Sequence, residues 1–341
     1  MKKLNRNLLR IGFIGPGSIG SLFGGYLASV HTDANPLEIF FFCRKGHAKV
    51  INEHGMKIYS DKCKITLTNI KAFENAENFT KISINDKKYK LDYLFLTTKT
   101  YDSERAMIQY KKLINSSNWL IILQNGIGNE ELVKKYCDEN KIIRIITSHG
   151  ALLKEYGCVY HTGVGFTNMG FVYLKSQKQN HSRYKSGYVK LNMLKNRLDA
   201  GGLETEIVDD IIKHTWEKAF VNIGINALGA LTRLNNGNLL ENEKLKQLMS
   251  AAVKEALEVA KLKCIELSDR DYVRLTYSVA EKTYNNKNSM LQDILKGNFT
   301  EIDFLNGRIV SLAKEVGLKV PINEMLTFLI KGLEESFRQE N

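Results

Sequence analysis

Proline and paired cysteine are scarce in this sequence. Its 341 residues include only three prolines, and neither a low-complexity tract nor an internal repeat is visible, which excludes a fibrous or disordered chain. The cysteines are odd in number and form no C-x-x-C pair, so they favour reduced thiols in a cytoplasm-like compartment over a disulfide framework. They are Cys43, Cys63, Cys137, Cys158 and Cys264.

Long apolar runs are also missing. No stretch of 18 apolar residues occurs, so no membrane span is expected. The N-terminal MKKLNRNLLR is basic, but the apolar residues after it, Ile11 to Ile14, are interrupted by glycine and proline and are too short for the core of a signal peptide. We therefore expect a cytoplasmic protein that does not bind a membrane.

Negative charge is under-represented, with 37 Asp and Glu against 49 Lys and Arg, a formal net charge of +12. Such a balance attracts anionic small molecules or acidic surfaces. The cations form no nucleic-acid-binding motif or aromatic-interleaved stripe, so we expect no nucleic acid partner. With 43% apolar residues, the chain is long enough for roughly two domains.

Short apolar runs alternate with amphipathic segments over the first two hundred residues, which is typical of a parallel sheet covered by helices. From about Asp210 onward, long helical periodicities replace the strands. We expect an α/β fold: a Rossmann-type doubly wound parallel sheet in residues 1–209 and an all-helical domain in residues 210–341. The polar segment Ser176–Ser186 is expected to be a surface loop. The expected strands are Ile11–Ile14, Glu38–Cys43, Tyr93–Thr97, Trp119–Leu123, Ile142–Thr147, Val159–Phe166, Met169–Leu174 and Glu204–Val208, and the expected helices are Ile211–Leu231, Asn242–Leu267, Asp269–Asn285 and Thr300–Val316.

A G-x-G-x-x-G motif, GPGSIG at 15–20, follows the first strand and opens a helix. In a dinucleotide site the first glycine permits a tight turn, the second admits the pyrophosphate, and the third lets the helix pack closely on the strand. The alternative is a turn that only needs glycine. The complete strand, turn and helix context favours a dinucleotide site.

The end of the second strand carries cations where an NAD site normally carries a carboxylate. It reads FCRKGH, with Arg44 and Lys45 and no Asp or Glu. A guanidinium can bind a 2′-phosphate with two charge-assisted hydrogen bonds, whereas a carboxylate would repel it. We therefore expect NADP(H). The alternative is that both cations are solvated loop charges, since Lys and Arg are abundant throughout the chain.

Two further polar segments follow expected strands. Lys99 comes after the strand that begins at Tyr93, and Asn125 opens the sequence NGIG after the strand that begins at Trp119. Doubly wound sheets bind ligands at these carboxyl ends. Each signal alone is weak, because Asn-Gly is more often only a turn.

The first helix of the C-terminal half carries polar residues at intervals of four. Lys218, Asn222 and Asn226 share one face of a helix that is otherwise apolar. Burying such groups without partners is costly, which favours a polar cleft. The alternative is an exposed polar stripe on a surface helix.

Polar residues also precede the last expected helix. Asn286 and Ser289 come before a glycine turn, and Thr300 and Glu301 follow it. Taken singly, they are best interpreted as a cap and an acidic residue that suits the helix dipole. The histidines form no ligand cluster, and no metal site is expected.

The ordered set of motifs resembles the ketopantoate reductase (2-dehydropantoate 2-reductase) family, from about Ile11 to the low 330s. That family reduces 2-dehydropantoate to pantoate with NADPH, on the route to pantothenate and coenzyme A. The motifs that carry the resemblance are GPGSIG, TTK, QNGIG, HTGVGFTNMG, WEKAFVNIGIN, NSMLQD and TEIDFLNG.

The resemblance assigns roles to individual residues. It makes Lys218 the catalytic lysine and Glu301 its acidic partner. Lysine chemistry suits this role, because an ammonium can stabilise the charge that develops on the 2-oxygen during hydride transfer and then donate a proton. The substrate-binding residues would be Asn222, Asn226, Asn236, Asn286 and Ser289. The cofactor-binding residues would be Gly15, Pro16, Gly17, Ser18, Ile19, Gly20, Arg44, Lys99 and Asn125.

Two alternatives remain open beside this function. One is a paralogous NADPH-dependent 2-keto acid or opine-type dehydrogenase, and the other is a non-enzymatic NADPH-binding protein. The expected partner is a small-molecule 2-keto acid, and a homodimer is possible. The segments Lys81–Lys90 and Ser176–Ser186 are longer than is usual in the family.

Overall fold

A computed structural model of the chain describes residues 8–61, 64–77, 79, 90–174 and 181–339. Contacts between Cα atoms divide it into two compact units. The first, the sheet unit, comprises Met1–Gln124 and Asn129–Ile211, and the second, the helical unit, comprises Ile212–Asn341 with the short segment Asn125–Gly128. This short segment contains the expected site residue Asn125, although the residues before and after it in the chain belong to the sheet unit.

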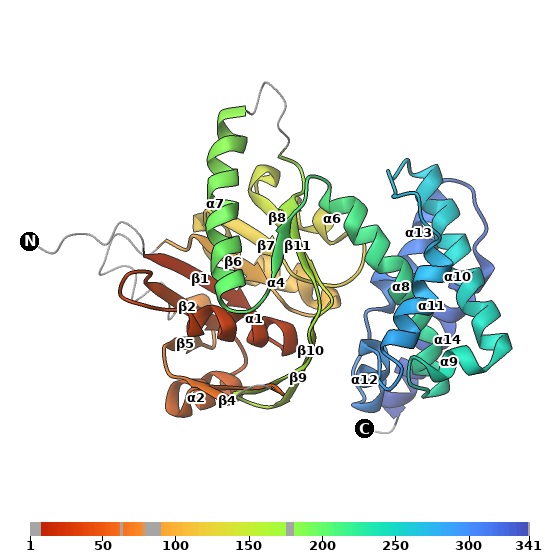
Figure 1. Cartoon of the computed structure of the whole chain (residues 1–341), viewed down its shortest axis with the longest axis horizontal. Helices are drawn as coiled ribbons and strands as arrows, with labels where there is room; N and C mark the ends of the chain where they lie inside the picture. Colours follow the sequence, from red (N-terminus) through yellow and green to blue (C-terminus); the bar gives the residue numbers. More distant parts are fainter. Residues whose placement is uncertain (1–7, 62–63, 78, 80–89, 175–180, 340–341) are drawn as a thin grey trace, which may run out of the picture. The chain divides into compact units, whose positions relative to one another are not determined.

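The sheet unit is built on an eight-stranded sheet in the order β12-β11-β8-β7-β6-β1-β2-β5 (Figure 1). All neighbouring pairs are parallel except β8 with β11, which is antiparallel. The strands are β1 Leu9–Ile14, β2 Leu37–Phe42, β5 Ile70–Phe73, β6 Tyr93–Leu96, β7 Trp119–Ile122, β8 Ile142–Thr147, β11 Thr167–Phe171 and β12 Thr205–Ile207. The expected Rossmann-type sheet is confirmed.

Helices cover both faces of this sheet, so its central strands are apolar on both sides. On β1, Phe13 belongs to the core under α1 and α7, whereas the next residue, Ile14, belongs to the core under α4, α5 and α6. Phe95 and Leu96 of β6 alternate in the same way. The helices of this unit are α1 Ser18–Ser29, α2 Lys45–His54, α4 Ser103–Gln109, α5 Lys111–Ser116, α6 Asn129–Val133 and α7 His181–Ala200, with short 3-10 turns η1 Thr100–Asp102 and η2 Glu139–Lys141.

A second sheet of four strands, in the order β4-β3-β10-β9, belongs to the same unit. Its strands are β3 Met56–Tyr59, β4 Lys64–Leu67, β9 Gly150–Glu155 and β10 Cys158–Gly163. Helix α1 contacts β9 and β10, so this small sheet lies against the helix that begins at the glycine motif.

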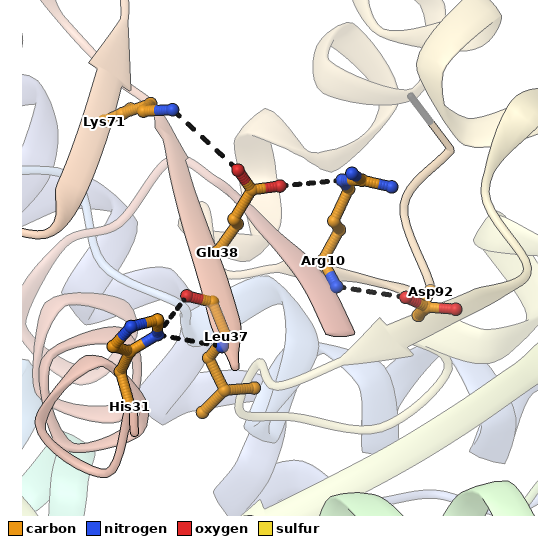
Figure 2. A network of polar contacts seen from close by, with 6 residues as sticks. All are labelled: Arg10, His31, Leu37, Glu38, Lys71 and Asp92. Atoms are coloured by element: carbon orange, nitrogen blue, oxygen red, sulfur yellow. Dashed lines mark hydrogen bonds and ion pairs between the residues drawn. The ribbon is translucent and has the colours of Figure 1, made fainter. Parts of the chain in front are cut away.

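Charged residues join the strands at the amino edge of the large sheet, which Figure 2 shows from close by. The Arg10 guanidinium donates to Glu38 Oε2 at 2.7 Å, and Lys71 Nζ lies 3.9 Å from Glu38 Oε1. The backbone N–H of Arg10 donates to Asp92 Oδ2 at 3.0 Å. Arg10, Glu38 and Lys71 are the second residues of β1, β2 and β5, and Asp92 directly precedes β6. The network therefore ties four neighbouring strands together away from their carboxyl ends.

The helical unit consists of α8 to α14 around one apolar core. It contains α8 Ile211–Thr232, α9 Asn238–Glu241, α10 Glu243–Leu262, α11 Tyr272–Lys282, α12 Ser289–Leu295, α13 Asn306–Glu315 and α14 Pro321–Gln339, with the 3-10 turn η4 Ile302–Phe304. The expectation of an all-helical C-terminal part is confirmed for the residues described.

Two expectations about local structure were wrong, and four strands were not predicted. The segment Ser176–Ser186 was expected to be a loop, yet α7 begins at His181, because Tyr184 and the leucines after it pack on the sheet; residues 175–180 lie outside the described part. The strands β3, β4, β5 and β9 were not expected. The helix expected over Thr300–Val316 is instead a 3-10 turn followed by α13, so Glu301 lies before the first helical turn rather than within it. Of the long segment Lys81–Lys90, only Lys90 is described.

Candidate functional site

The glycine motif turns the chain from β1 into α1. Gly15 has φ +63°, and a Cβ at this position would overlap the side chain of Thr98. A Cβ at Gly20 would come within 2.5 Å of Thr97 Oγ1. At Gly17, by contrast, a Cβ would meet nothing within 4 Å. Two glycines therefore let the turn pack on the chain after β6, and the middle one leaves its surface open, as a pyrophosphate needs.

The N-terminus of α1 is free of competing side chains. Gly17 occupies the N-cap position with no side-chain cap, and the first turn holds no acidic residue. Its helix dipole and backbone N–H groups suit a phosphate. The hydroxyl of Ser18 accepts a hydrogen bond from Leu153 N–H at 3.0 Å, so this side chain ties the start of α1 to β9, and its own O–H can still donate to a ligand. Ile19 is half buried and packs against the core, and Pro16 lies in the turn itself.

Arg44 stands directly before α2, at its N-cap, and its side chain is exposed like that of Lys45. Neither cation makes an ion pair with any residue in the described part of the chain. Next to them, burial and then the charge of Glu74 raise the pKa of the Cys43 thiol to about 12, so Cys43 stays neutral. The free guanidinium at the end of β2 fits a 2′-phosphate.

Lys99 follows β6 and occupies the N-cap of η1, where it is half buried. It lies at the carboxyl edge of the large sheet, as the glycine motif does. The expected cofactor residues of the sheet unit therefore lie on the edge where parallel sheets bind ligands.

In the helical unit, Asn125 links Lys218 and Glu301. The ammonium of Lys218 donates to Asn125 Oδ1 at 2.6 Å, and Asn125 Nδ2 lies 3.5 Å from Glu301 Oε2. Lys218 is half buried and Glu301 is buried. The amide thus holds a cation by its oxygen and faces a carboxylate with its N–H, which fixes the amide orientation.

The segment Asn125–Gly128 is seated in the helical unit by its backbone. Ile127 N–H donates to the carbonyl of Phe304 at 2.9 Å. Gly126 has φ +89°, and a Cβ there would come within 2.6 Å of the same carbonyl. This glycine allows the close approach that places Asn125 beside Lys218.

Beyond Lys218, the same face of α8 carries amides that lack partners. Asn226 is only 4% exposed and Asn222 is half buried, yet neither side chain has a hydrogen-bonding partner among the described residues. The face continues to Gly229, where a Cβ would overlap Asn288 Nδ2. That nitrogen is also buried without a partner in the described structure. Unpaired buried amides are costly unless a ligand satisfies them.

The remaining expected substrate residues lie around Asn288. Asn286 and Ser289 are exposed, and Ser289 is the first residue of α12. Asn236 N–H donates to the carbonyl of Asn286 at 3.0 Å, while its side chain donates to Thr283 Oγ1 at 2.9 Å. Asn236 therefore holds this loop, and its buried Oδ1 has no partner within the described residues.

Sequence reasoning missed Asn288. Its Oδ1 accepts from Leu291 N–H at 2.9 Å and so caps α12, which leaves only its Nδ2 for a ligand. An Asn directly before a helical segment is a common N-cap, so its position in the sequence indicates a structural role and gives no sign of a binding role.

A buried polar network under the carboxyl edge of the sheet was also missed. Arg144 of β8 is 1% exposed, pairs with Glu130 at 2.8 Å and donates to the carbonyl of Gln124 at 3.3 Å. The Gln124 side chain in turn donates to the carbonyl of Thr98 and to Ser103 Oγ, each at 2.8 Å. This network fixes the residue that precedes Asn125 in the chain.

Among the residues that the structure describes, no group of three His, Cys, Asp or Glu side chains is arranged to hold a metal ion. Within the same ranges, no helix is both long and apolar enough to cross a bilayer.

The chain was compared with known proteins. The family model of the ketopantoate reductase PanE/ApbA matches residues 11–172, and that of its C-terminal region matches residues 210–334. A 2-dehydropantoate 2-reductase of Pyrococcus horikoshii is 36% identical over 96% of this chain and 98% of its own length. One of Archaeoglobus fulgidus is 31% identical over 95% and 98%.

Solved structures share the fold. A PanE/ApbA family ketopantoate reductase from Ralstonia eutropha JMP134 has a TM-score of 0.82 at 23% identity, covering 97% of this chain and 100% of that one. The D-mandelate dehydrogenase complex with NADH and anilino(oxo)acetate has a TM-score of 0.79 at 24% identity, covering 97% and 100%. By its sequence over both regions and by its fold, the chain belongs to the ketopantoate reductase PanE/ApbA family.

Proposed function

We propose that this protein reduces 2-dehydropantoate to pantoate with NADPH, in the synthesis of pantothenate and coenzyme A. The observation that carries the proposal is the pairing of Lys218 with Asn125 at the head of a helix face lined by unpaired amides. That arrangement offers one proton donor together with several hydrogen-bonding groups for a small polar substrate. The names of the relatives, 2-dehydropantoate 2-reductases, support the choice of 2-dehydropantoate as the substrate.

The residues of the sheet unit fit the cofactor. The open surface at Gly17 and the uncapped start of α1 suit a pyrophosphate. The exposed cations at the end of β2, Arg44 and Lys45, suit a 2′-phosphate, and no carboxylate follows that strand to hold a ribose 2′-hydroxyl. We therefore propose NADP(H) over NAD(H), with Lys99 as a further cation for the cofactor.

When bound, the cofactor supplies a hydride to the 2-keto carbon of the substrate. Lys218 then has two tasks: its ammonium stabilises the negative charge that develops on the 2-oxygen, and it donates the proton that completes the alcohol. Asn125 holds Nζ at 2.6 Å and so orients it. Glu301, on the other side of the Asn125 amide, keeps positive charge at this point favourable and can accept a hydrogen bond from a substrate hydroxyl.

The substrate presents a carboxylate, a keto oxygen and a hydroxyl, each of which needs hydrogen-bonding partners. Asn222 and Asn226 can donate from α8, and Ser289 can donate from the start of α12. Asn286 is exposed next to Ser289, and Asn236 holds the loop that carries it. We propose that these five residues bind the substrate.

A paralogous 2-keto acid or opine-type dehydrogenase is the main alternative. It is favoured by the likeness in fold to a D-mandelate dehydrogenase, which reacts with a different acid and was solved with NADH. The second alternative, an NADPH-binding protein without activity, gives no reason for a lysine and a glutamate to share the Asn125 amide. We also propose that the protein works in the cytoplasm on a small molecule, with a homodimer as a possible assembly.

The test is NADPH oxidation at 340 nm with 2-dehydropantoate and a panel of other 2-keto acids. The proposal expects the highest kcat/KM for 2-dehydropantoate, and a much lower kcat/KM with NADH. A preference for another acid would favour the paralogous enzyme. Binding of NADPH without turnover of any acid would favour the non-enzymatic alternative.

A further inference from the structure

His47, the third residue of α2, is buried at the centre of a hydrogen-bond chain in the sheet unit. The residue is 3% exposed. Nδ1 accepts from the backbone N–H of Gly157 at 3.0 Å, and Nε2 lies 3.4 Å from Ser21 Oγ. The Ser21 hydroxyl donates to the carbonyl of Pro16 at 3.0 Å. The chain therefore runs from the β9–β10 turn through α2 to the glycine motif.

The direction of every hydrogen bond in this chain follows from one donor. A backbone N–H can only donate, so Nδ1 of His47 carries no proton and the ring proton of the neutral form lies on Nε2. Nε2 then donates to Ser21, whose own proton is used on Pro16. Burial lowers the pKa of His47 to about 4, so the ring stays neutral at pH 7 and the chain is complete.

The chain joins the two parts of the sheet unit that we assign to the cofactor. Pro16 lies between the two glycines that form the turn, and Arg44 stands three residues before His47. The ring of Tyr156 fills the space that a side chain at Gly46 would occupy, and its centroid lies 5.9 Å from that of the His47 ring. The backbone N–H of Gly15 also donates to the carbonyl of Phe42 at 2.9 Å, and the chain through His47 adds a side-chain link between the start of α2 and the glycine turn.

We propose that His47 is a positioning residue that holds Arg44 and Lys45 in register with the glycine turn, and so sets the preference of the protein for a 2′-phosphorylated dinucleotide. The inference rests on the proposed NADPH specificity and deepens it. A guanidinium and a phosphate form two directional hydrogen bonds, so a small displacement of the start of α2 weakens them. The pyrophosphate contacts that we propose come from backbone N–H groups at the start of α1. Backbone hydrogen bonds from Gly17 to Gly15 and from Ser21 to Gly17 hold that turn, so these contacts should depend on His47 less.

Direct binding measurements test this role without any turnover. The Kd values of NADPH and NADH are measured by protein fluorescence titration for the wild type, His47→Phe and Ser21→Ala. His54→Phe is the matched control, because His54 lies on the same helix with an exposed ring. We expect His47→Phe to reduce the preference for NADPH by about tenfold, the scale of one buried hydrogen bond, mainly through a weaker Kd for NADPH. His54→Phe should leave the preference unchanged.

A conservative variant separates positioning from bulk packing. His47→Asn can place an amide oxygen where Nδ1 accepts from Gly157, so it should restore part of the preference that His47→Phe loses. If His47→Phe fails to fold, as judged by circular dichroism, Ser21→Ala takes its place, since it cuts the same chain at a small side chain and should also reduce the preference.

Three results would overturn the inference: a folded His47→Phe with an unchanged ratio of the two Kd values, an equal loss for both cofactors, or an unchanged ratio in Ser21→Ala when the His47 variant does not fold. Failure of the proposed function looks different. In that case the wild type itself binds NADH as tightly as NADPH, or Arg44→Ala leaves the ratio unchanged.

Discussion

Lys218 Nζ and Asn125 Oδ1 are 2.6 Å apart although 93 residues separate them in the chain. Asn125 belongs to a four-residue segment that packs with the helical unit, while the residues on both sides of it belong to the sheet unit. The Lys218 ammonium is therefore not simply solvated on a polar helix face, because it donates a hydrogen bond to the Asn125 amide. This pairing gives the first prediction its physical basis.

Replacing Lys218 by alanine should lower kcat by roughly 10² to 10⁴, the usual effect of losing an acid–base group. Apart from Asn125, the residues proposed for the cofactor belong to the sheet unit, so the Kd of NADPH should change much less than kcat. Steady-state kinetics at 340 nm and a fluorescence titration measure the two effects. Lys213→Ala, on the same helix, is the control and should keep its turnover. Near-normal turnover in Lys218→Ala would remove this residue from the mechanism.

Arg44→Ala should weaken the binding of NADPH much more than that of NADH, because only NADPH carries the 2′-phosphate. A charge-assisted pair at an exposed site makes a loss of about tenfold or more in Kd reasonable. Lys49→Ala removes an exposed cation from the same helix and serves as the control for general electrostatic attraction. Equal losses for both cofactors would contradict the assignment.

The buried pair of Arg144 and Glu130 should matter for stability. Arg144→Met leaves a carboxylate buried without its partner, which should lower the free energy of unfolding by about 3–5 kcal/mol. The double variant Arg144→Met with Glu130→Leu should regain most of the lost stability, since it leaves no unpaired buried charge. Urea unfolding measures both. If the double variant is no more stable than the single one, charge burial is not the cause.

Stability should fall as the pH drops from about 6.5 to 4. Burial lowers the pKa of His47 to about 4, and burial followed by the charge of His161 lowers that of His149 to about 4. In the unfolded chain both titrate near 6.5, so between these pH values the unfolded state binds protons that the folded state does not. At pH 5 each histidine should lower the free energy of unfolding by about 1–2 kcal/mol relative to its value at pH 7.

Urea midpoints at pH 7 and pH 5 test this expectation. The pH dependence should be weaker in a variant that carries both His47→Phe and His149→Phe, and unchanged in His54→Gln, whose ring is exposed in the folded protein. If the double variant loses as much stability as the wild type between pH 7 and pH 5, groups other than these two histidines cause the pH dependence.

The sequence predicted the sheet unit where its signals are local. A buried strand, a glycine turn and a helix follow one another within 20 residues, and Leu22, Phe23 and Leu27 are buried as their helical spacing indicated. The face shared by Lys218 and Asn222 could be predicted for the same reason, since it needs only the period of a helix.

Non-local structure could not be predicted from the sequence. Strand β9, GALLKE, shows no alternation because it is half buried or exposed along its whole length. The contacts of Asn125 with Lys218 and Glu301, and that of His47 with Gly157, join residues 93 to 176 positions apart, and no pattern in a single sequence indicates which of them meet. Asn288 was overlooked because an Asn at this position is explained by its Oδ1, which caps α12. The sequence does not indicate that its Nδ2 is buried without a partner in the described structure.

The charged network around Arg10 and Glu38 occupies the opposite end of the strands that carry the glycine turn and Arg44. Protein engineering can therefore treat the two edges of one sheet separately. Extra ion pairs or better packing at the starts of β1 and β2 would raise heat resistance while the groups proposed for recognition, several residues further along each strand, stay as they are. The same separation makes that edge a suitable place for a fluorescent label that reports on binding without disturbing it.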